Sequence, residues 1–132
     1  MVTQLTLSTP REGLLPLTSQ IQKLVAESGV NDGYCLVFCP HTTAAITLNE
    51  NSDPDVMHDV LIGLDSAFPD DRRFRHSEGN SAAHLKSSAI GASELVPIHE
   101  GKLVLGIWQD IYFCEFDGPR SRTVHIQIVS AS

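Results

Sequence analysis

The segment from His76 to His84 contains two imidazoles, a carboxylate at Glu78 and an amide at Asn80 within nine residues. Imidazole is the commonest metal ligand among side chains and titrates near neutral pH. Gly79 lies between these groups and allows the backbone to turn sharply or to approach a ligand closely. A surface loop gains no stability from collecting such side chains, so we expect a functional site here.

His41 is the expected third member of this site. After Pro40 the residues alternate in polarity, which places His41 on the polar side of a strand or in a cleft. Three neutral imidazoles, from His41, His76 and His84, leave an open coordination position, as in catalytic zinc sites. Imidazoles suit zinc or another transition metal, whereas Mg²⁺ prefers oxygen ligands. The histidine spacing matches no zinc signature, so a polar surface cluster without metal stays an alternative.

A second polar run follows a buried strand at Asn49-Glu50 and continues to Asp55. Helix capping explains Asp53, and the helix dipole explains Asp55. Neither effect explains Asn49 or Glu50. Glu50 is a candidate general base, Mg²⁺ ligand or ligand of the histidine-bound metal. The alternative is a solvated turn.

Arginines near the histidines indicate a phosphate or diphosphate ligand, since guanidinium groups bind such anions bidentately. Arg120 is the preferred candidate because it closes a defined turn. The sequence leaves open the roles of Arg72, Arg73 and Arg75. For Arg72 and Arg73 the alternative is a solvated loop in which they neutralise the preceding aspartates.

Two further candidates lie near the C-terminal strands. Trp108 could form the wall of a pocket for a planar ring, with Gln109 binding the polar edge of that ring. The alternative is a core tryptophan. Glu115 alternates with Ile111 and Phe113 and therefore shares their apolar face, so it must be paired, at an edge or in a site.

The elements that must position these groups are short and mostly β. Helices are expected over residues 19–28, 53–68 and 81–90, and strands over residues 2–8, 34–39, 41–48, 94–98, 102–107, 111–116 and 123–129. Asn80 would cap the third helix. The pattern predicts one α+β domain over residues 1–132, a mainly antiparallel β-sandwich with two or three helices.

Three local details of this reading can be checked against the structure. Ser19 and Gln22 form a capping-box pattern at the start of the first helix. The dense apolar run from Tyr34 to Cys39 predicts a strand buried on both faces. Residues 117–120 carry turn signals that predict a hairpin between the last two strands.

Composition excludes several classes of protein. The chain has 132 residues and a net charge of −7, which argues against general binding to nucleic acids or to anionic membranes. No apolar run approaches the length of a membrane span. The three cysteines form no C-x-x-C pair, so we expect reduced, buried thiols and a cytoplasmic protein.

Five motifs occur in a fixed order and cover nearly the whole chain from the first helix onward. They are Pro40-His-Thr-Thr-Ala-Ala, Asn49-Glu50, His76-x-Glu-Gly-Asn-x-x-x-His84, Leu105-Gly-x-Trp-Gln109 and Glu115-x-Asp-Gly-Pro-Arg-x-Arg122. Together they resemble the YjbQ family, small proteins also described as secondary thiamine-phosphate synthases.

The resemblance implies a jelly-roll-like or α+β sandwich, a homotrimer, and a cleft that contains the motif histidines and a divalent metal. It also implies formation of thiamine phosphate by condensation of hydroxymethylpyrimidine diphosphate with thiazole phosphate, with release of diphosphate. The motif positions carried over as site residues are His41, Asn49, Glu50, His76, Asn80, His84, Gln109, Glu115 and Arg120.

Two other functions stay open. An open three-histidine zinc site could activate water in a metal-dependent hydrolase of a small phosphorylated or amide metabolite. The same polar groups could instead belong to a non-catalytic module that binds a metabolite.

Overall fold

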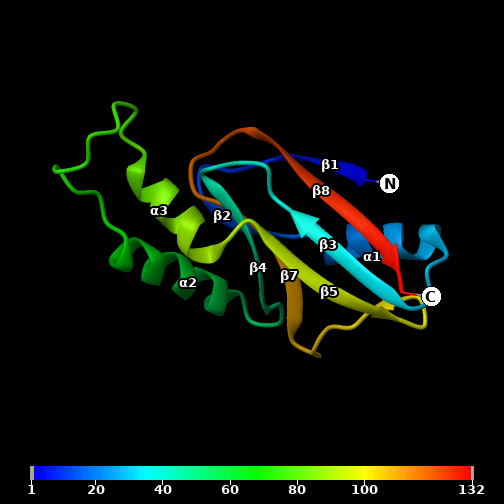
Figure 1. Cartoon of the computed structure of the whole chain (residues 1–132). Coiled ribbons are helices and arrows are strands. Elements are labelled where there is room, and N and C mark those ends of the chain that lie inside the picture. Colours follow the sequence, from blue (N-terminus) through cyan, green and yellow to red (C-terminus); the bar gives the residue numbers. More distant parts are fainter. Residues whose placement is uncertain (1, 132) are drawn as a thin grey trace.

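Residues 2–131 are described by the structure, a computed structural model, and they form eight strands and three helices (Figure 1). The elements are β1 (Val2–Ser8), β2 (Gly13–Pro16), α1 (Thr18–Ser28), β3 (Gly33–Phe38), β4 (Ala44–Glu50), α2 (Pro54–Ala67), α3 (Ser81–Ile90), β5 (Ser93–His99), β6 (Lys102–Leu103), β7 (Gln109–Glu115) and β8 (Ser121–Ser130).

The strands form two antiparallel sheets. The larger sheet has the order β1-β8-β3-β5-β6, and the smaller has the order β2-β7-β4. Alternating residues of the strands supply one face to a shared core, as the period of a half-buried strand requires. This core includes Val37, Ile46, Phe113 and Ile126. The predicted α+β class with mainly antiparallel strands is confirmed.

α1 packs on the same core through Ile21 and Val25, both fully buried. Its N-cap residue is Leu17, and no side chain caps the helix. The predicted capping box is therefore wrong. Gln22 instead donates to the Gly101 carbonyl and accepts from the Leu103 N–H, so it ties α1 to the β5–β6 turn.

β3 also differs from its prediction. Cys35 and Val37 are buried, whereas Tyr34 and Phe38 are each 41% exposed. One face of the larger sheet is thus uncovered in the monomer. The apolar density of the run reflects an exposed apolar face rather than burial on both sides.

The last two strands do not form a hairpin. β7 pairs with β2 and β4, while β8 pairs with β1 and β3. The turn at residues 117–120 therefore carries the chain from one sheet to the other. A hairpin and a connection between two sheets can have the same turn residues. Only long-range strand pairing distinguishes them, so the local sequence could not.

α2 and α3 lie together at one side of the molecule, with the segment between them projecting outward (Figure 1). Ala83 of α3 joins a second apolar cluster with Ala45, Cys114 and Phe116. The Asp53 side chain caps α2 by accepting from the Asp55 N–H at 2.9 Å, as predicted.

α2 has no fully buried residue, in contrast to α3. Lys86 of α3 is almost completely buried and forms ion pairs with Asp65 of α2 and with Glu12. These charges hold α2 and the loop after β1 against α3.

Two expectations concern the chain as a whole. Cys35, Cys39 and Cys114 are unpaired and buried, as expected. Burial raises the pKa of Cys35 to about 11 and that of Cys114 to about 12, so both thiols stay protonated at neutral pH. Among the described residues, no helix has the length and hydropathy needed to cross a membrane.

Candidate functional site

All three histidines of the predicted site line one polar pocket of about 360 Å³. The pocket lies where the segment before β4, the start of α3 and the start of β8 meet. Its lining residues are Pro40, His41, Thr42, Thr43, His76, Glu78, Asn80, His84, Arg120 and Arg122. The structure therefore brings together five of the nine residues that the sequence singled out, namely His41, His76, Asn80, His84 and Arg120.

His76 and His84 face each other across the pocket wall. Their ring centroids are 5.2 Å apart, and the rings are nearly perpendicular. Glu78 lies on the same loop, with one carboxylate oxygen 3.9 Å from Nε2 of His76. Gly79, with φ of 75°, makes the turn that joins this loop to α3.

His41 is held by the backbone of β8. Its Nε2 lies 3.0 Å from the Thr123 N–H nitrogen and 3.1 Å from the Thr123 carbonyl oxygen. Burial and the nearby Arg122 charge lower the pKa of His41, so the ring is neutral at pH 7. In the tautomer that carries its proton on Nδ1, Nε2 accepts from the Thr123 N–H.

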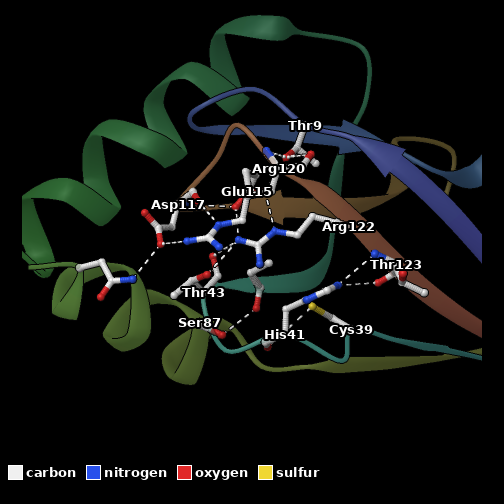
Figure 2. A network of polar contacts seen from close by, with 12 residues as sticks. Thr9, Cys39, His41, Thr43, Ser87, Glu115, Asp117, Arg120, Arg122 and Thr123 are labelled. Carbon is white, nitrogen blue, oxygen red and sulfur yellow. Dashed lines mark hydrogen bonds and ion pairs between the residues drawn. The ribbon is translucent and has the colours of Figure 1, made fainter. Parts of the chain in front are cut away.

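Arg122, one of the residues that line the pocket, forms a buried ion pair with Glu115 (Figure 2). Glu115 is completely buried and accepts from Nε and Nη2 of Arg122 at 2.7 and 2.6 Å. The Thr9 hydroxyl and the Asp117 N–H also donate to this carboxylate. Arg122 donates in addition to the Thr43 hydroxyl at 2.9 Å.

These contacts fix the ionisation of the pair. Burial alone would raise the pKa of Glu115, but the hydrogen bonds from Arg122, Thr9 and the Asp117 N–H together hold it below its ordinary value. The hydrogen bond to Glu115 in turn raises the pKa of Arg122. Glu115 is thus a positioning residue that orients Arg122, and its lone pairs are occupied by protein donors.

Arg120 and Asn80 meet at Asp117. Arg120 donates to the Asp117 carbonyl and carboxylate, and Nδ2 of Asn80 donates to the same carboxylate at 2.8 Å. The Asn80 side chain therefore links α3 to the β7–β8 turn instead of capping the helix. Its Oδ1 is buried and has no hydrogen-bond partner among the described residues.

Asn49, Glu50 and Gln109 lie at the other end of the smaller sheet. Glu50 pairs with Gln109 in the β4–β7 ladder, whereas Ala44 pairs with Glu115. Six residues separate Ala44 from Glu50, which corresponds to about 20 Å along a strand. These three candidates do not line the histidine pocket formed by the described residues 2–131.

The groups at this second end make mostly local contacts. Oε1 of Gln109 accepts from the Gly106 N–H, and Oδ1 of Asn49 accepts from the Glu50 N–H. Trp108 is 58% exposed, so it is not a core residue. The structure thus gives Gln109 a role in holding the turn before β7.

The charged loop before His76 is mostly solvated. Arg73 pairs with Asp71 at 2.6 Å on the surface, and the hydrogen bonds from Arg73 lower the pKa of this carboxyl. Arg72 and Arg75 line two separate pockets that both include Phe74.

The donor set of the pocket bears on metal binding. No group of three histidine, cysteine, aspartate or glutamate side chains converges on one point within residues 2–131. His76 and His84 are the two imidazoles whose rings lie close together, whereas Nε2 of His41 is engaged by the backbone. A pair of imidazoles near the Glu78 carboxylate fits a transition metal better than Mg²⁺.

Arg122, which lines the pocket, and Asp117, which holds Arg120 and Asn80, are two residues that the list of candidates omitted. Arg122 alternates with Val124 and Ile126 on β8, so it occupies a core-facing position. An arginine in that register requires a buried acceptor, and Glu115 on an apolar face requires a buried donor. Reading the two strands together would have predicted the pair.

Comparison with known proteins agrees with this architecture. The sequence model of the family described as UPF0047 protein YjbQ-like matches residues 3–131. The UPF0047 protein YugU of Bacillus subtilis is 49% identical over 123 residues, which cover 92% of this chain and 93% of that protein.

Solved structures agree equally well. An uncharacterized protein of the yjbq/upf0047 family from Clostridium acetobutylicum superimposes with a TM-score of 0.93 at 51% identity, covering 96% of this chain and 99% of that one. A protein of unknown function from Sulfolobus solfataricus gives a TM-score of 0.93 at 34% identity, covering 98% and 96%. The chain belongs to the YjbQ (UPF0047) family.

Proposed function

We propose that the protein is a transferase that acts on small phosphorylated metabolites at the histidine pocket, with thiamine-phosphate synthase as its activity. The observation that supports this proposal is the shared pocket of the three histidines with Arg120 and Arg122. Condensation of hydroxymethylpyrimidine diphosphate with thiazole phosphate forms a C–N bond to the thiazole nitrogen and releases diphosphate. The charge that develops on diphosphate must be stabilised as the bond to it breaks.

Guanidinium groups provide donors for such a leaving group. Arg122 uses Nε and Nη2 for protein contacts, and Arg120 uses the same two nitrogens. Each arginine therefore retains Nη1 for a ligand, within the part of the chain that is described. Asp117 and Glu115 hold the two guanidiniums in fixed orientations, which favours phosphate binding because less side-chain entropy is lost.

A divalent metal is part of the proposal. His76 and His84 would hold it, and no third histidine, cysteine, aspartate or glutamate of residues 2–131 converges with them on one point. Such an ion would supply positive charge to the departing diphosphate. Metal analysis of protein purified without chelator tests this, and His84→Ala is expected to lose the bound ion.

The activity is tested by following thiamine phosphate formation with the two substrates. His84→Ala is expected to lower turnover at least about 100-fold, the usual contribution of a positioned acid, base or ligand. His99→Ala is the matched control, because His99 is an exposed histidine at the β5–β6 turn, away from the pocket. Unchanged turnover in a folded His84→Ala variant would contradict the proposal.

Hydrolysis is the competing reaction of the same pocket, and one assay separates the two. If hydroxymethylpyrimidine diphosphate is consumed without thiazole phosphate, the protein is a hydrolase. Retention of the substrate without any conversion would identify a binding module instead.

We also propose a cytoplasmic homotrimer. The uncovered face of the larger sheet carries Val2, Tyr34, Phe38 and Leu95, each at least 41% exposed, which is unusual for a sheet that faces water. Leu95→Glu is expected to shift the mass measured by light scattering from trimer to monomer. A monomeric wild-type protein would contradict this part.

Subunit contacts could also unite the two ends of the smaller sheet. Glu50→Ala and His84→Ala are expected to be inactive separately. If Glu50 of one subunit completes the pocket of another, co-expression of both variants restores part of the activity. Restoration is not expected if Glu50 serves only its own strand.

A further inference from the structure

A second, mostly apolar pocket of about 380 Å³ adjoins the histidine pocket. It is lined by Phe74, Arg75, His76, Ser81, His84 and Leu85. His76 and His84 belong to both pockets, so this histidine pair forms the boundary between them. One side of the pair is polar and contains Arg120 and Arg122, and the other side is apolar.

The apolar side does not follow from core packing. α3 buries Ala83, Lys86 and Ser87, so Leu85 points away from the core and is 40% exposed. Phe74 is 39% exposed on the loop before His76. Folding does not favour leaving both side chains in water on the same patch, whereas a ligand pocket requires such a surface.

The loop holds Phe74 in a defined position. The Asp71 carboxylate accepts from the Arg73 N–H at 2.8 Å, and the Asp71 carbonyl accepts from the Phe74 N–H at 3.0 Å. These bonds form a tight turn, and Phe74 at its end lines the same pocket as His76 and His84. The aromatic ring is therefore partly preorganised for a ligand.

We propose that this apolar pocket binds the planar ring of the substrate while its phosphate occupies the histidine pocket. The inference rests on the proposed function and adds where its heteroaromatic substrate lies: the ring beside Phe74 and Leu85, and the phosphate or diphosphate in the histidine pocket. A short linker is expected because the two pockets are adjacent and share His76 and His84 as lining residues. This arrangement assigns the ring subsite to Phe74 and Leu85 instead of Trp108.

The chemistry of both sides supports one shared ligand. A ring stacked on Phe74 gains aromatic and apolar contacts, and the neighbouring Arg75 can lie against its face. The phosphate then meets the donors of Arg120 and the imidazoles. A purely aliphatic phosphate would use only the second set of contacts.

The test compares two simple probes, benzyl phosphate and ethyl phosphate, by titration calorimetry on the full chain. Wild-type protein is expected to bind benzyl phosphate about three- to tenfold more tightly, the usual gain from an aromatic contact. Phe74→Ala is expected to bring this ratio close to one, and Leu85→Ala to lower it. Arg120→Ala should weaken both probes and leave the ratio unchanged.

Ile62→Ala is the matched control for Leu85→Ala, because it removes the same number of carbon atoms from a side chain that is 53% exposed on α2. The ratio of the affinities for benzyl phosphate and ethyl phosphate should be the same in Ile62→Ala as in the wild type. Phe74→Leu, which keeps an apolar side chain, should give an intermediate ratio and guards against misfolding of the alanine variant.

The inference would be overturned if the wild type bound both probes equally or bound neither. It would also be overturned if Phe74→Ala kept the wild-type preference for benzyl phosphate. Failure of the proposed function is distinguishable from these results. Absence of thiamine phosphate formation with an intact, Phe74-dependent ratio would reject the synthase and retain the ring subsite.

Discussion

Replacing Glu115 with glutamine should destabilise the protein strongly, although glutamine has almost the same shape. Glu115 is fully buried, and Arg122 is only 4% exposed. The amide places an NH₂ donor where the carboxylate now accepts from Arg122, Thr9 or the Asp117 N–H, and it leaves the guanidinium charge buried without a counter-ion. Removing one partner of a buried pair costs about 3–5 kcal/mol, a large part of the roughly 5–15 kcal/mol that stabilises a domain.

Urea unfolding at pH 7 measures this loss. With an m-value of about 2 kcal/mol/M, the midpoint of Glu115→Gln should fall by about 2 M. Asp71→Asn is the control, because it makes the same chemical change in the exposed pair with Arg73 and should leave the midpoint almost unchanged.

The difference in unfolding free energy between the wild type and Glu115→Gln should also depend on pH. Because the pKa of Glu115 is lower in the folded than in the unfolded state, its stabilisation is complete above the ordinary value of 4.5 and is lost as the pH falls through the folded value. The gap should therefore narrow below about pH 4.5. A gap under about 1 kcal/mol at pH 7, or one that stays constant down to acid unfolding, would refute the role given to the buried pair.

Three other predictions concern separate parts of the fold. Gly33→Ala should lower the unfolding free energy by about 1–3 kcal/mol, because its Cβ would overlap the backbone oxygen of Val129; an unchanged melting curve would show that the strands can move apart. In NMR titration of metal-free protein, the pKa of His41 should lie below the ordinary histidine value, because burial and the Arg122 charge lower it. The pKa of His99 should lie above that value, because His99 donates a hydrogen bond to Asp32. Asp32→Asn should lower the pKa of His99 and leave that of His41 unchanged. Amide hydrogens of α2 should exchange faster than those of β7, since α2 lacks a fully buried residue, and equal protection would contradict this.

Features fixed by neighbouring residues were predictable from the sequence. Asp53-Pro54 predicted the start of α2, because the Asp53 side chain caps the helix within one turn; residues 81–90 of α3 were also predicted, although the Asn80 side chain does not cap that helix. The alternation of Glu115 with Ile111 predicted a buried carboxylate that needs a partner, and Arg122 is that partner.

Features that depend on long-range pairing were not predictable. The turn after Glu115 has the same residues whether it closes a hairpin or connects two sheets, and only the pairing of β7 with β4 decides between them. The separation of Glu50 from His41, in contrast, follows from one strand alone and was predictable. His41 precedes β4 and Glu50 is its last residue, so the extended length of the strand carries them to opposite ends.

The weak attachment of α2 has a consequence for how ligand preference can change during evolution. Residues 54–80 include no fully buried residue, yet they carry Phe74, His76 and Glu78 to the edge of the two pockets. Insertions and substitutions in this stretch leave the sandwich core intact, and longer loops add only slowly to the entropy of closure. We therefore expect sequence changes in this segment to alter ligand preference, while the ion pair of Glu115 and Arg122 keeps the rest of the histidine pocket unchanged.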